Sequence, residues 1–359
     1  MKRPIRALMY GVGAVARRQM VRLMKDKGVE IVGAVSRSRD IGRDLGEVCG
    51  LGRPLGVYID NDPQRAIAGR KIDIAVHAVT NALEASFDHI AVCVHSGINV
   101  LTIGTQAINP RDTVPAAAAE LDRMARENGV TIAASGFQDV YWISMITQLA
   151  GTSHQIESIH GTARFNINEF GPEVARTYFV GDAVDDFRHS IAKNGPPANT
   201  LRYCAERICA ALELTVNTVE EACEPVIADR DVACTSLSTT VPAGRLIGCT
   251  GICDIQTVQG IGLRVRYVRQ CYQPGEKDIN RWIIHGIPDI TVEIIDPPTE
   301  VATAATTVNR IPDVINAAPG FVTCDQLPPV RYRPRPLHHY VRADRSWVSP
   351  PPGKRPFQI

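Results

Sequence analysis

The sequence predicts an α/β protein, in which an N-terminal Rossmann-type doubly wound parallel sheet is followed by a second, α+β domain. From residue 5 to 134, short β-rich runs alternate with helical runs, which is typical of parallel strands joined by helical crossovers. After about residue 155, the pattern changes to long β-branched runs that suit a largely antiparallel sheet covered on one face. The 359 residues are enough for two such domains.

We place the dinucleotide-binding domain at residues 1–150. Its strands are expected at 5–10, 29–35, 55–59, 72–79, 98–103 and 130–134. Helical stretches between these strands include 82–96 and 114–128. His77 falls inside one of the buried strands and is expected to be a core histidine.

We place the second domain at residues 151–300. Its strands lie within 245–272 and 281–295, and helices are expected at 205–214 and 219–223. A helix over 302–317, within the exit segment 301–327, is expected to return to the first domain. The tail at 328–359 is rich in proline and arginine and fits neither a regular helix nor a central strand. It is expected to be either flexible or an extended arm across a neighbouring subunit.

The composition indicates an ordinary soluble globular protein whose partner is a small molecule. Hydrophobic residues make up 45% and charged residues 21%, and the net charge of +1 lacks the basic excess that attracts nucleic acid or an anionic membrane. The 10 cysteines are irregularly spaced in apolar segments, which favours buried thiols in a cytoplasmic protein. Cys249 and Cys253 lack a second ligand pair, so we expect core residues and no metal site.

A nucleotide-binding motif follows the first strand. In "MYGVGAVARRQM", Gly11, Gly13 and Ala16 have the G-x-G-x-x-A spacing between a strand and a helix. The first glycine permits a tight turn, the second lets a pyrophosphate approach the backbone, and the alanine allows close packing of helix on strand. We expect Gly11, Gly13, Ala14 and Val15 to surround the phosphates at the helix N-terminus.

The end of the second strand favours NADP(H) over NAD(H). An acid at this place usually binds the ribose hydroxyl, but "GAVSRSRD" offers Ser36, Arg37 and Arg39 instead. A hydroxyl and guanidinium groups can donate hydrogen bonds to a 2′-phosphate, which a carboxylate would repel. Two alternatives stay open: the arginines form only a solvated turn, or Asp40 binds the ribose and NAD(H) is used.

Several segments together resemble the 2,4-diaminopentanoate dehydrogenases and native amine dehydrogenases, within the broader dihydrodipicolinate-reductase-like group. They cover most of residues 5–328, with a looser match over 156–241. The matching stretches are "GVGAVA", "GAVSRSRDIGRDLGE", "HAVTNALE", "GINVLTIGTQAINP", "ENGVTIAASG", "GIPDITVEI" and "ATAATTVNRIPDVINAAPGFVTCDQLP". The resemblance implies a Rossmann domain, a substrate and dimerisation domain, a homodimer, and conversion of a ketone and ammonia to an amine, or the reverse, through an imine.

The loop after the fifth strand departs from this family. Where the relatives usually carry a Glu-Glu pair, this chain has Thr105 and Gln106. A carboxylate stabilises an ammonium or iminium, whereas hydroxyl and amide donors suit a neutral carbonyl or imine. The departure favours reduction of C=O, or of a C=N that is protonated elsewhere. Thr80 and Thr105 are expected to orient the nicotinamide end, and Thr105 also to contact substrate.

A second departure is the segment "SGFQDVYW" at 135–142, which replaces the family's Gly-Asn-Pro-Gly-Phe loop. Asp139 could supply the displaced carboxylate and Tyr141 could donate a proton, with Gln138 and Trp142 near the substrate. The alternative is that Asp139 caps the following helix and that Tyr141 and Trp142 are packing residues.

A polar row in the second domain offers a substrate wall. Alternate side chains of a strand share one face, so the polar residues of "IHGTARFNIN" line up. They are His160, Thr162, Arg164, Asn166 and Asn168. The alternative is the solvent face of an ordinary sheet, and His285 is a weaker candidate.

We therefore expect an NADP(H)-dependent oxidoreductase that transfers hydride at the C=O or C=N carbon of a small ketone, imine or amine. The catalytic candidates are Gln106, Asp139 and Tyr141. The alternatives are a carbonyl reductase that does not use ammonia and a non-catalytic NADP-binding sensor or scaffold.

Overall fold

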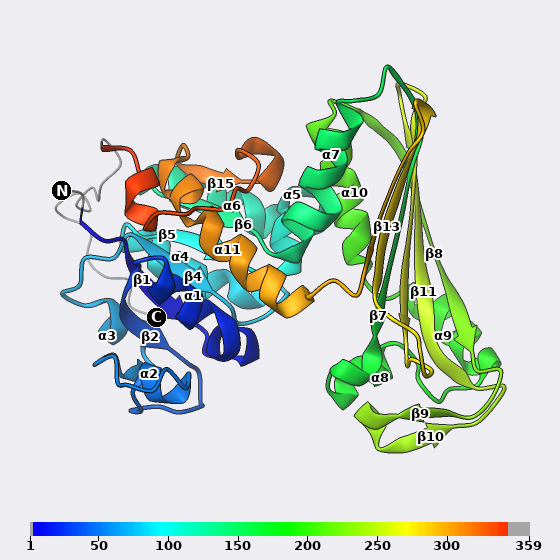
Figure 1. The fold of residues 1–359 in the computed structure, drawn as a ribbon, viewed down its shortest axis with the longest axis horizontal. Coiled ribbons are helices and arrows are strands. Elements are labelled where there is room, and N and C mark those ends of the chain that lie inside the picture. Colours follow the sequence, from blue (N-terminus) through cyan, green and yellow to red (C-terminus); the bar gives the residue numbers. More distant parts are fainter. Residues whose placement is uncertain (1–2, 344–359) are drawn as a thin grey trace. The chain divides into compact units, whose positions relative to one another are not determined.

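The computed structural model describes residues 3–343, and the chain folds into two units (Figure 1). The first unit runs from the N-terminus to Val140 and resumes at Pro298. The second unit is Tyr141–Pro297. Within residues 3–343, no helix is both long enough and apolar enough to cross a bilayer.

A seven-stranded parallel sheet forms the centre of the first unit, in the order β15-β6-β5-β4-β1-β2-β3. Its strands are β1 (Arg6–Tyr10), β2 (Glu30–Val35), β3 (Ile59–Asp60), β4 (Ile74–His77), β5 (Asn99–Thr102), β6 (Thr131–Ala134) and β15 (Gly320–Val322). The predicted doubly wound parallel sheet is confirmed. The edge strand β15 is an addition from the C-terminal part of the chain that the sequence pattern did not indicate.

Helices cover both faces of this sheet. The helices are α1 (Val21–Asp26), α2 (Leu45–Val48), α3 (Pro63–Ile67), α4 (Phe87–His95), α5 (Pro110–Thr113), α6 (Pro115–Glu127) and α11 (Thr299–Asn316). On one face α1 and α11 pack together against the sheet, and on the other α4 packs beside α3 and α6 (Figure 1). The buried side chains of α6, among them Ala118, Leu121 and Ala125, recur at the spacing of one helix face.

The second unit is built on a mixed six-stranded sheet in the order β14-β13-β7-β12-β11-β8. Only the β12–β7 pair is parallel, so the predicted largely antiparallel sheet is confirmed. The strands are β7 (Gln155–Asn166), β8 (Val216–Ile227), β11 (Leu246–Thr257), β12 (Gly262–Gln270), β13 (Ile279–Ile287) and β14 (Ile290–Ile295), with a separate pair β9 (Val232–Cys234) and β10 (Thr239–Val241).

Four helices belong to the second unit. They are α7 (Met145–Ala150), α8 (Pro172–Thr177), α9 (Val184–Asn194) and α10 (Thr200–Ala211). The helix predicted at 219–223 is wrong, because these residues lie in the middle of β8. Their helix-favouring residues are overridden by antiparallel pairing with β11, where Glu221 faces Cys253 and Val219 faces Ile255.

The described part of the Pro/Arg-rich tail packs on its own first unit. Leu337 is fully buried in the core, and its backbone N–H donates to the carbonyl of Lys27 at 2.9 Å. The side chain of Lys27 donates in turn to the carbonyl of Arg333, and Arg333 pairs with Asp313 at 2.6 Å. The expectation of a flexible or subunit-crossing tail is therefore wrong up to residue 343, and residues 344–359 lie outside the described residues.

A buried ion pair connects the point where the chain leaves the first unit to the helix on which it returns. Arg310, on α11, donates from Nη2 to Asp139 at 2.7 Å and from Nε at 3.0 Å. Both side chains are 0% exposed, and Ser135 donates a further hydrogen bond to Asp139 at 2.7 Å. Arg310 also donates to the carbonyl of Pro328. The exit and the return of the chain are thus joined by one charge pair.

We expect Asp139→Asn to destabilise the first unit by about 3 kcal/mol, because removal of one partner of a buried pair leaves the other charge uncompensated. The free energy of unfolding would be measured in urea. Glu120→Gln removes the partner of an exposed ion pair with Arg123 and should have little effect. A protein with Asp139→Asn that is as stable as the parent would contradict the importance of this pair.

Candidate functional site

The turn after β1 shows why glycines stand at two positions of the motif. Gly11 has φ +98°, and a Cβ there would lie 2.5 Å from the carbonyl oxygen of Ala78, so only glycine fits. A Cβ on Gly13 would meet only that same oxygen, at 4.0 Å. The first glycine is required by the protein's own backbone, whereas the second leaves open space beside the turn. This space is what close approach of a pyrophosphate would need.

A helix begins directly after the turn. Ala14 and Val15 are already helical, and they lead into the π-helical turn η1 (Ala16–Met20) and then α1. Ala16 is fully buried, which agrees with its expected packing against the sheet. The first N–H groups of a helix have no intrahelical acceptor, so this end of the helix can hold the phosphates of a dinucleotide.

The turn at the end of β2 carries two exposed arginines, and the nearby acid, Asp40, is already paired with other arginines. Ser36 is buried, and Arg37 and Arg39 are exposed. Asp40 accepts hydrogen bonds from Arg17 and, at 2.6 Å, from Arg43. The hydrogen bond from Arg17 lowers the pKa of Asp40, so this carboxylate is ionised and paired at neutral pH.

Arg17 connects the glycine turn with the turn after β2. Its Nε donates to the carbonyl of Val12 at 2.8 Å, while its Nη2 binds Asp40. Sequence reasoning missed this residue, although it follows the glycine motif directly in "GAVARR". A basic residue one turn into the helix was the available signal, but its partner 23 positions further on was not apparent from the pattern.

The loops after β4 and β5 lie against each other. A Cβ on Gly104 would be 2.9 Å from the carbonyl oxygen of Thr80, which shows how closely the loops approach. Gln106, in the 3-10 turn η3 (Thr105–Ile108), accepts the backbone N–H of Leu83 at 2.8 Å through Oε1. Because a backbone N–H can only donate, the amide oxygen must face Leu83 and the NH₂ group forms the other end.

The structure places Asp139 in the interior of the first unit. Its carboxylate is bound by Arg310 and Ser135 and is 0% exposed. This geometry gives the residue a positioning role between two chain segments. Its expected catalytic role stays a prediction. In this buried, paired position Asp139 does not visibly take the place of the Glu-Glu pair that the family carries in the loop after the fifth strand.

The second unit begins at Tyr141, two residues after Asp139. Tyr141 is half-buried, and its carbonyl accepts a hydrogen bond from Asn280 at 3.1 Å. Trp142 is buried, with its ring edge-on to that of Tyr267 at 5.3 Å. The packing alternative therefore describes Trp142 well, whereas Tyr141 and the half-buried Gln138 stay untested as catalytic or substrate residues.

The predicted polar row lies on β7 from His160 to Asn166, whereas its last member, Asn168, lies in the following 3-10 turn η5 (Ile167–Glu169). Ile159 and Ala163 are buried, while His160 between them is exposed, as alternation requires. The ring of His160 lies 4.8 Å from that of His285 on the neighbouring strand. Arg164 donates to the carbonyl of Lys277 at 3.0 Å.

The last two members of the row hold the surrounding loops. Asn166 accepts backbone hydrogen bonds from Asn168 and Tyr272. Asn168 donates to the carbonyl of Ala233 at 3.2 Å and accepts from Thr235 at 2.9 Å. These contacts explain the two asparagines structurally, and a substrate role for the row stays a prediction.

His77 occupies the core position predicted for it. It is 1% exposed, and its Nδ1 lies 3.1 Å from the hydroxyl oxygen of Thr102. Burial lowers the pKa of His77 to about 3, so the imidazole is neutral at neutral pH. Its ring stacks at a tilt with those of Tyr10 and His89.

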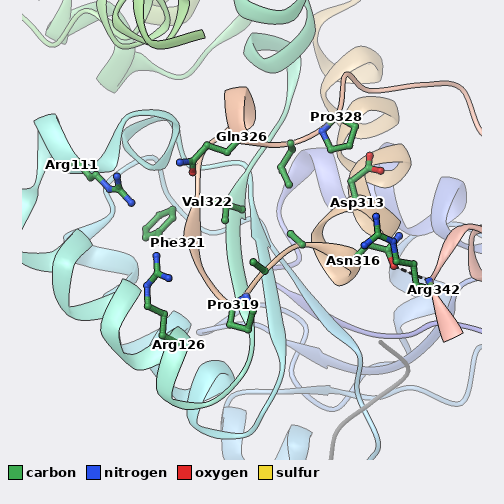
Figure 2. Close-up of a pocket in the computed structure, with 13 residues that line it drawn as sticks. Arg111, Arg126, Asp313, Asn316, Pro319, Phe321, Val322, Gln326, Pro328 and Arg342 are labelled. Carbon is green, nitrogen blue, oxygen red and sulfur yellow. Dashed lines mark hydrogen bonds between the residues drawn. The ribbon is translucent and has the colours of Figure 1, made fainter. Parts of the chain in front are cut away.

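A cavity of about 520 Å³ lies in the first unit away from all these residues. It is formed by β15, the end of α11 and neighbouring loops. Figure 2 shows Arg111, Phe321 and Arg126 together at one end of the cavity, with Asp313 and Arg342 at the other end. None of the residues expected to bind coenzyme or substrate lines this cavity.

Comparison with known proteins agrees with the resemblance seen in the sequence. The 2,4-diaminopentanoate dehydrogenase C-terminal domain matches residues 142–337, more than half of the chain. A 2,4-diaminopentanoate dehydrogenase of Acetoanaerobium sticklandii is 26% identical over 335 residues, which cover 90% of this chain and 93% of that protein.

Solved structures are also similar. The amine dehydrogenase of Mycobacterium smegmatis is 38% identical, with a TM-score of 0.83, over 92% of this chain and 98% of that one. The myo-inositol 2-dehydrogenase of Lactobacillus plantarum is 13% identical, with a TM-score of 0.57, over 90% and 93% of the two chains, and shows a shared fold only. The chain belongs to the 2,4-diaminopentanoate dehydrogenase family and is an oxidoreductase of the amine dehydrogenase type.

Proposed function

We propose that the protein is an NADP(H)-dependent oxidoreductase acting at a C=O or C=N carbon of a small ketone, imine or amine. The observation that carries this proposal is the glycine turn of a dehydrogenase-family chain, with open space at Gly13 in front of a helix N-terminus. The residues present fit a dinucleotide, and when bound its nicotinamide supplies or accepts the hydride. The ten cysteines form no disulfide within the described residues, which supports a cytoplasmic location.

The charges at the end of β2 support the choice of NADP(H). Asp40 is already paired with Arg17 and Arg43, which disfavours its use as the ribose-binding acid. Arg37 and Arg39 stand exposed in the same turn and can neutralise a 2′-phosphate. Arg17 then acts as a positioning residue, because it joins the turn that would hold the pyrophosphate to the turn that would hold the 2′-phosphate.

Arg37→Asp should weaken NADPH binding at least tenfold more than NADH binding, because a carboxylate there would repel the 2′-phosphate. Dissociation constants would be measured by quenching of protein fluorescence. Arg53→Asp makes the same change of charge at another exposed arginine and should leave the NADPH to NADH ratio unchanged. An equal loss for both coenzymes in Arg37→Asp would count against this site.

We propose Gln106 as the group that polarises the reacting bond. Its amide oxygen is fixed by Leu83, which leaves the NH₂ end as a neutral hydrogen-bond donor. Such a donor stabilises negative charge that develops on a carbonyl oxygen or imine nitrogen. Thr80 and Thr105 would orient the nicotinamide end. Tyr141 is the proposed proton donor, and Gln138, Trp142 and the β7 row are the proposed substrate contacts.

Gln106→Glu is the sharpest test, because glutamate has the same shape and can still accept from Leu83. We expect ammonia-independent reduction of ketones and aldehydes with NADPH to fall about a hundredfold, the effect of losing one such donor. Ammonia-dependent amination should fall less or rise, because the carboxylate would stabilise a cation. If turnover falls equally with and without ammonia in Gln106→Glu, the donor role is contradicted. If the parent protein binds coenzyme tightly but turns over no substrate, the sensor alternative is favoured.

We also propose a homodimer that forms through the face of the second-unit sheet carrying His160, an alternative to the substrate role of the β7 row, because the interface would cover the same face. The charged residues of this face form ion pairs on the surface. Arg264 pairs with Asp254, Arg266 with Glu224 and Arg281 with Glu293. A face whose charges are already balanced can meet a second copy of itself without strong repulsion. Ile283 stands between these pairs on β13 and is half-buried in the single chain.

Light scattering should give a mass of about twice the 39.1 kDa of one chain. Ile283→Glu should produce monomers, because it places an unpaired charge in the interface. Val258→Glu, at an exposed position in the turn after β11, is the matched control and should stay dimeric. Dimers that persist in Ile283→Glu would place the interface elsewhere.

A further inference from the structure

The second unit contains a buried arginine without a carboxylate partner. Arg269, on β12, is 0% exposed. Its Nη1 donates to the carbonyl of Ala198 at 3.1 Å, but Nε and Nη2 are buried and have no oxygen acceptor among the described residues, only the thiol of Cys249 as a neighbour. Its guanidinium lies 4.4 Å from the ring of Tyr178 and 5.2 Å from that of Tyr267. Aromatic faces stabilise a cation only in part and carry no compensating charge.

This arrangement is costly unless an anion is close. A guanidinium does not lose its proton in a protein, so Arg269 cannot become neutral as a buried lysine or histidine can. An isolated charge that is taken out of water loses much more hydration free energy than one hydrogen bond to a carbonyl can replace. A buried water could accept from Nε or Nη2, but it would leave the charge uncompensated.

A second orphan donor lies beside the first. Asn199 caps α10, because its side-chain oxygen accepts the backbone N–H of Leu201. Asn199 as a whole is 3% exposed. Its Nδ2 is buried and has no acceptor among the described residues. A Cβ on Gly251 would be 2.5 Å from Arg269 Nη2 and 3.3 Å from Asn199 Nδ2, so both nitrogens reach the same place over this glycine.

The 12-residue helix α10 begins at the same place. Its N-terminus adds a positive potential of its own, because the first N–H groups of a helix point outward. A guanidinium, an amide NH₂ and a helix N-terminus are all donors, and each favours negative charge. Two of the three are buried polar side chains with nitrogens that lack an oxygen acceptor, so the helix end does not stand alone.

We propose that Arg269 Nη2 and Asn199 Nδ2, at the N-terminus of α10, form a binding site for a small monovalent anion, a halide or a carboxylate. The site lies wholly within the second unit and does not depend on the proposed coenzyme or reaction. The anion supplies the charge that Arg269 lacks and the acceptor that the Asn199 amide lacks.

An internal anion is the main competitor. Cys249 faces Arg269 across the β11–β12 pair. A hydrogen bond from Cys223, followed by the positive charge of Arg269 and a hydrogen bond from it, lowers the pKa of the Cys249 thiol, although burial opposes this shift. A Cys249 thiolate would compensate the guanidinium, but the Asn199 amide would still have no acceptor. The two explanations therefore differ in whether an external anion binds.

The test uses bromide and formate as probes of the full-length protein. Each sodium salt is titrated while a bulky sulfonate keeps the ionic strength constant, and the melting temperature is recorded. We expect a saturable rise of several degrees, because a ligand that binds only the folded state stabilises it. In crystals grown with bromide, we expect an anomalous peak within hydrogen-bonding distance of Arg269 and Asn199. Competition between formate and bromide shows whether the site also takes a carboxylate.

Asn199→Asp is the decisive variant, because aspartate caps a helix as well as asparagine and brings its own negative charge to Arg269. The variant should lose the anion-dependent rise in melting temperature while remaining at least as stable as the anion-free parent. Asn217→Asp, an exposed position on β8, should keep the rise. If the melting temperature shows no saturable rise and the crystals show no bromide peak, the proposal is overturned. A thiolate absorbance that disappears in Cys249→Ser would then assign the compensating charge to Cys249.

Discussion

The first unit depends on the ion pair between Asp139 and Arg310. The chain leaves this unit at Val140 and returns at Pro298, so two segments that are 171 positions apart must be brought into register. A bidentate guanidinium–carboxylate contact fixes both distance and orientation, which apolar packing of α11 alone would not do. Once α11 is fixed, the chain can continue into β15 and complete the edge of the parallel sheet next to β6.

The same sheet determines where a dinucleotide could lie. All seven strands are parallel, so their carboxyl ends share one edge, and the glycine turn, the β2 turn and the Thr80 and Gln106 loops meet there. Gly11 is required by the carbonyl of Ala78, and Gly104 by the carbonyl of Thr80. The backbone at this edge is therefore tightly constrained by the protein itself, while open space is left at Gly13.

Local patterns predicted the fold well and the contacts between distant residues poorly. Alternating apolar runs located the strands of the first sheet, and the glycine spacing located its turn, because both depend on neighbouring residues. β15 has only three residues, too few for a periodic signal, and residues 219–223 have a helical composition that strand pairing overrides. The partners of Asp139 and Asp40 could not be predicted, because Arg310 and Arg17 become neighbours only through the tertiary fold.

Arg310 and Arg269, both fully buried among residues 3–343, show how differently the units compensate charge. Arg310 has the carboxylate of Asp139 at 2.7 Å, the hydroxyl of Ser135 beyond it and a backbone carbonyl, so its charge is balanced inside the protein. Arg269 is equally buried but has one carbonyl, two aromatic rings and a neighbouring thiol. Since neither guanidinium can shed its proton, equal burial requires comparable compensation. Among the described residues only ionisation of Cys249 could balance Arg269, whereas an external anion would balance it and also supply the acceptor that the Asn199 amide lacks.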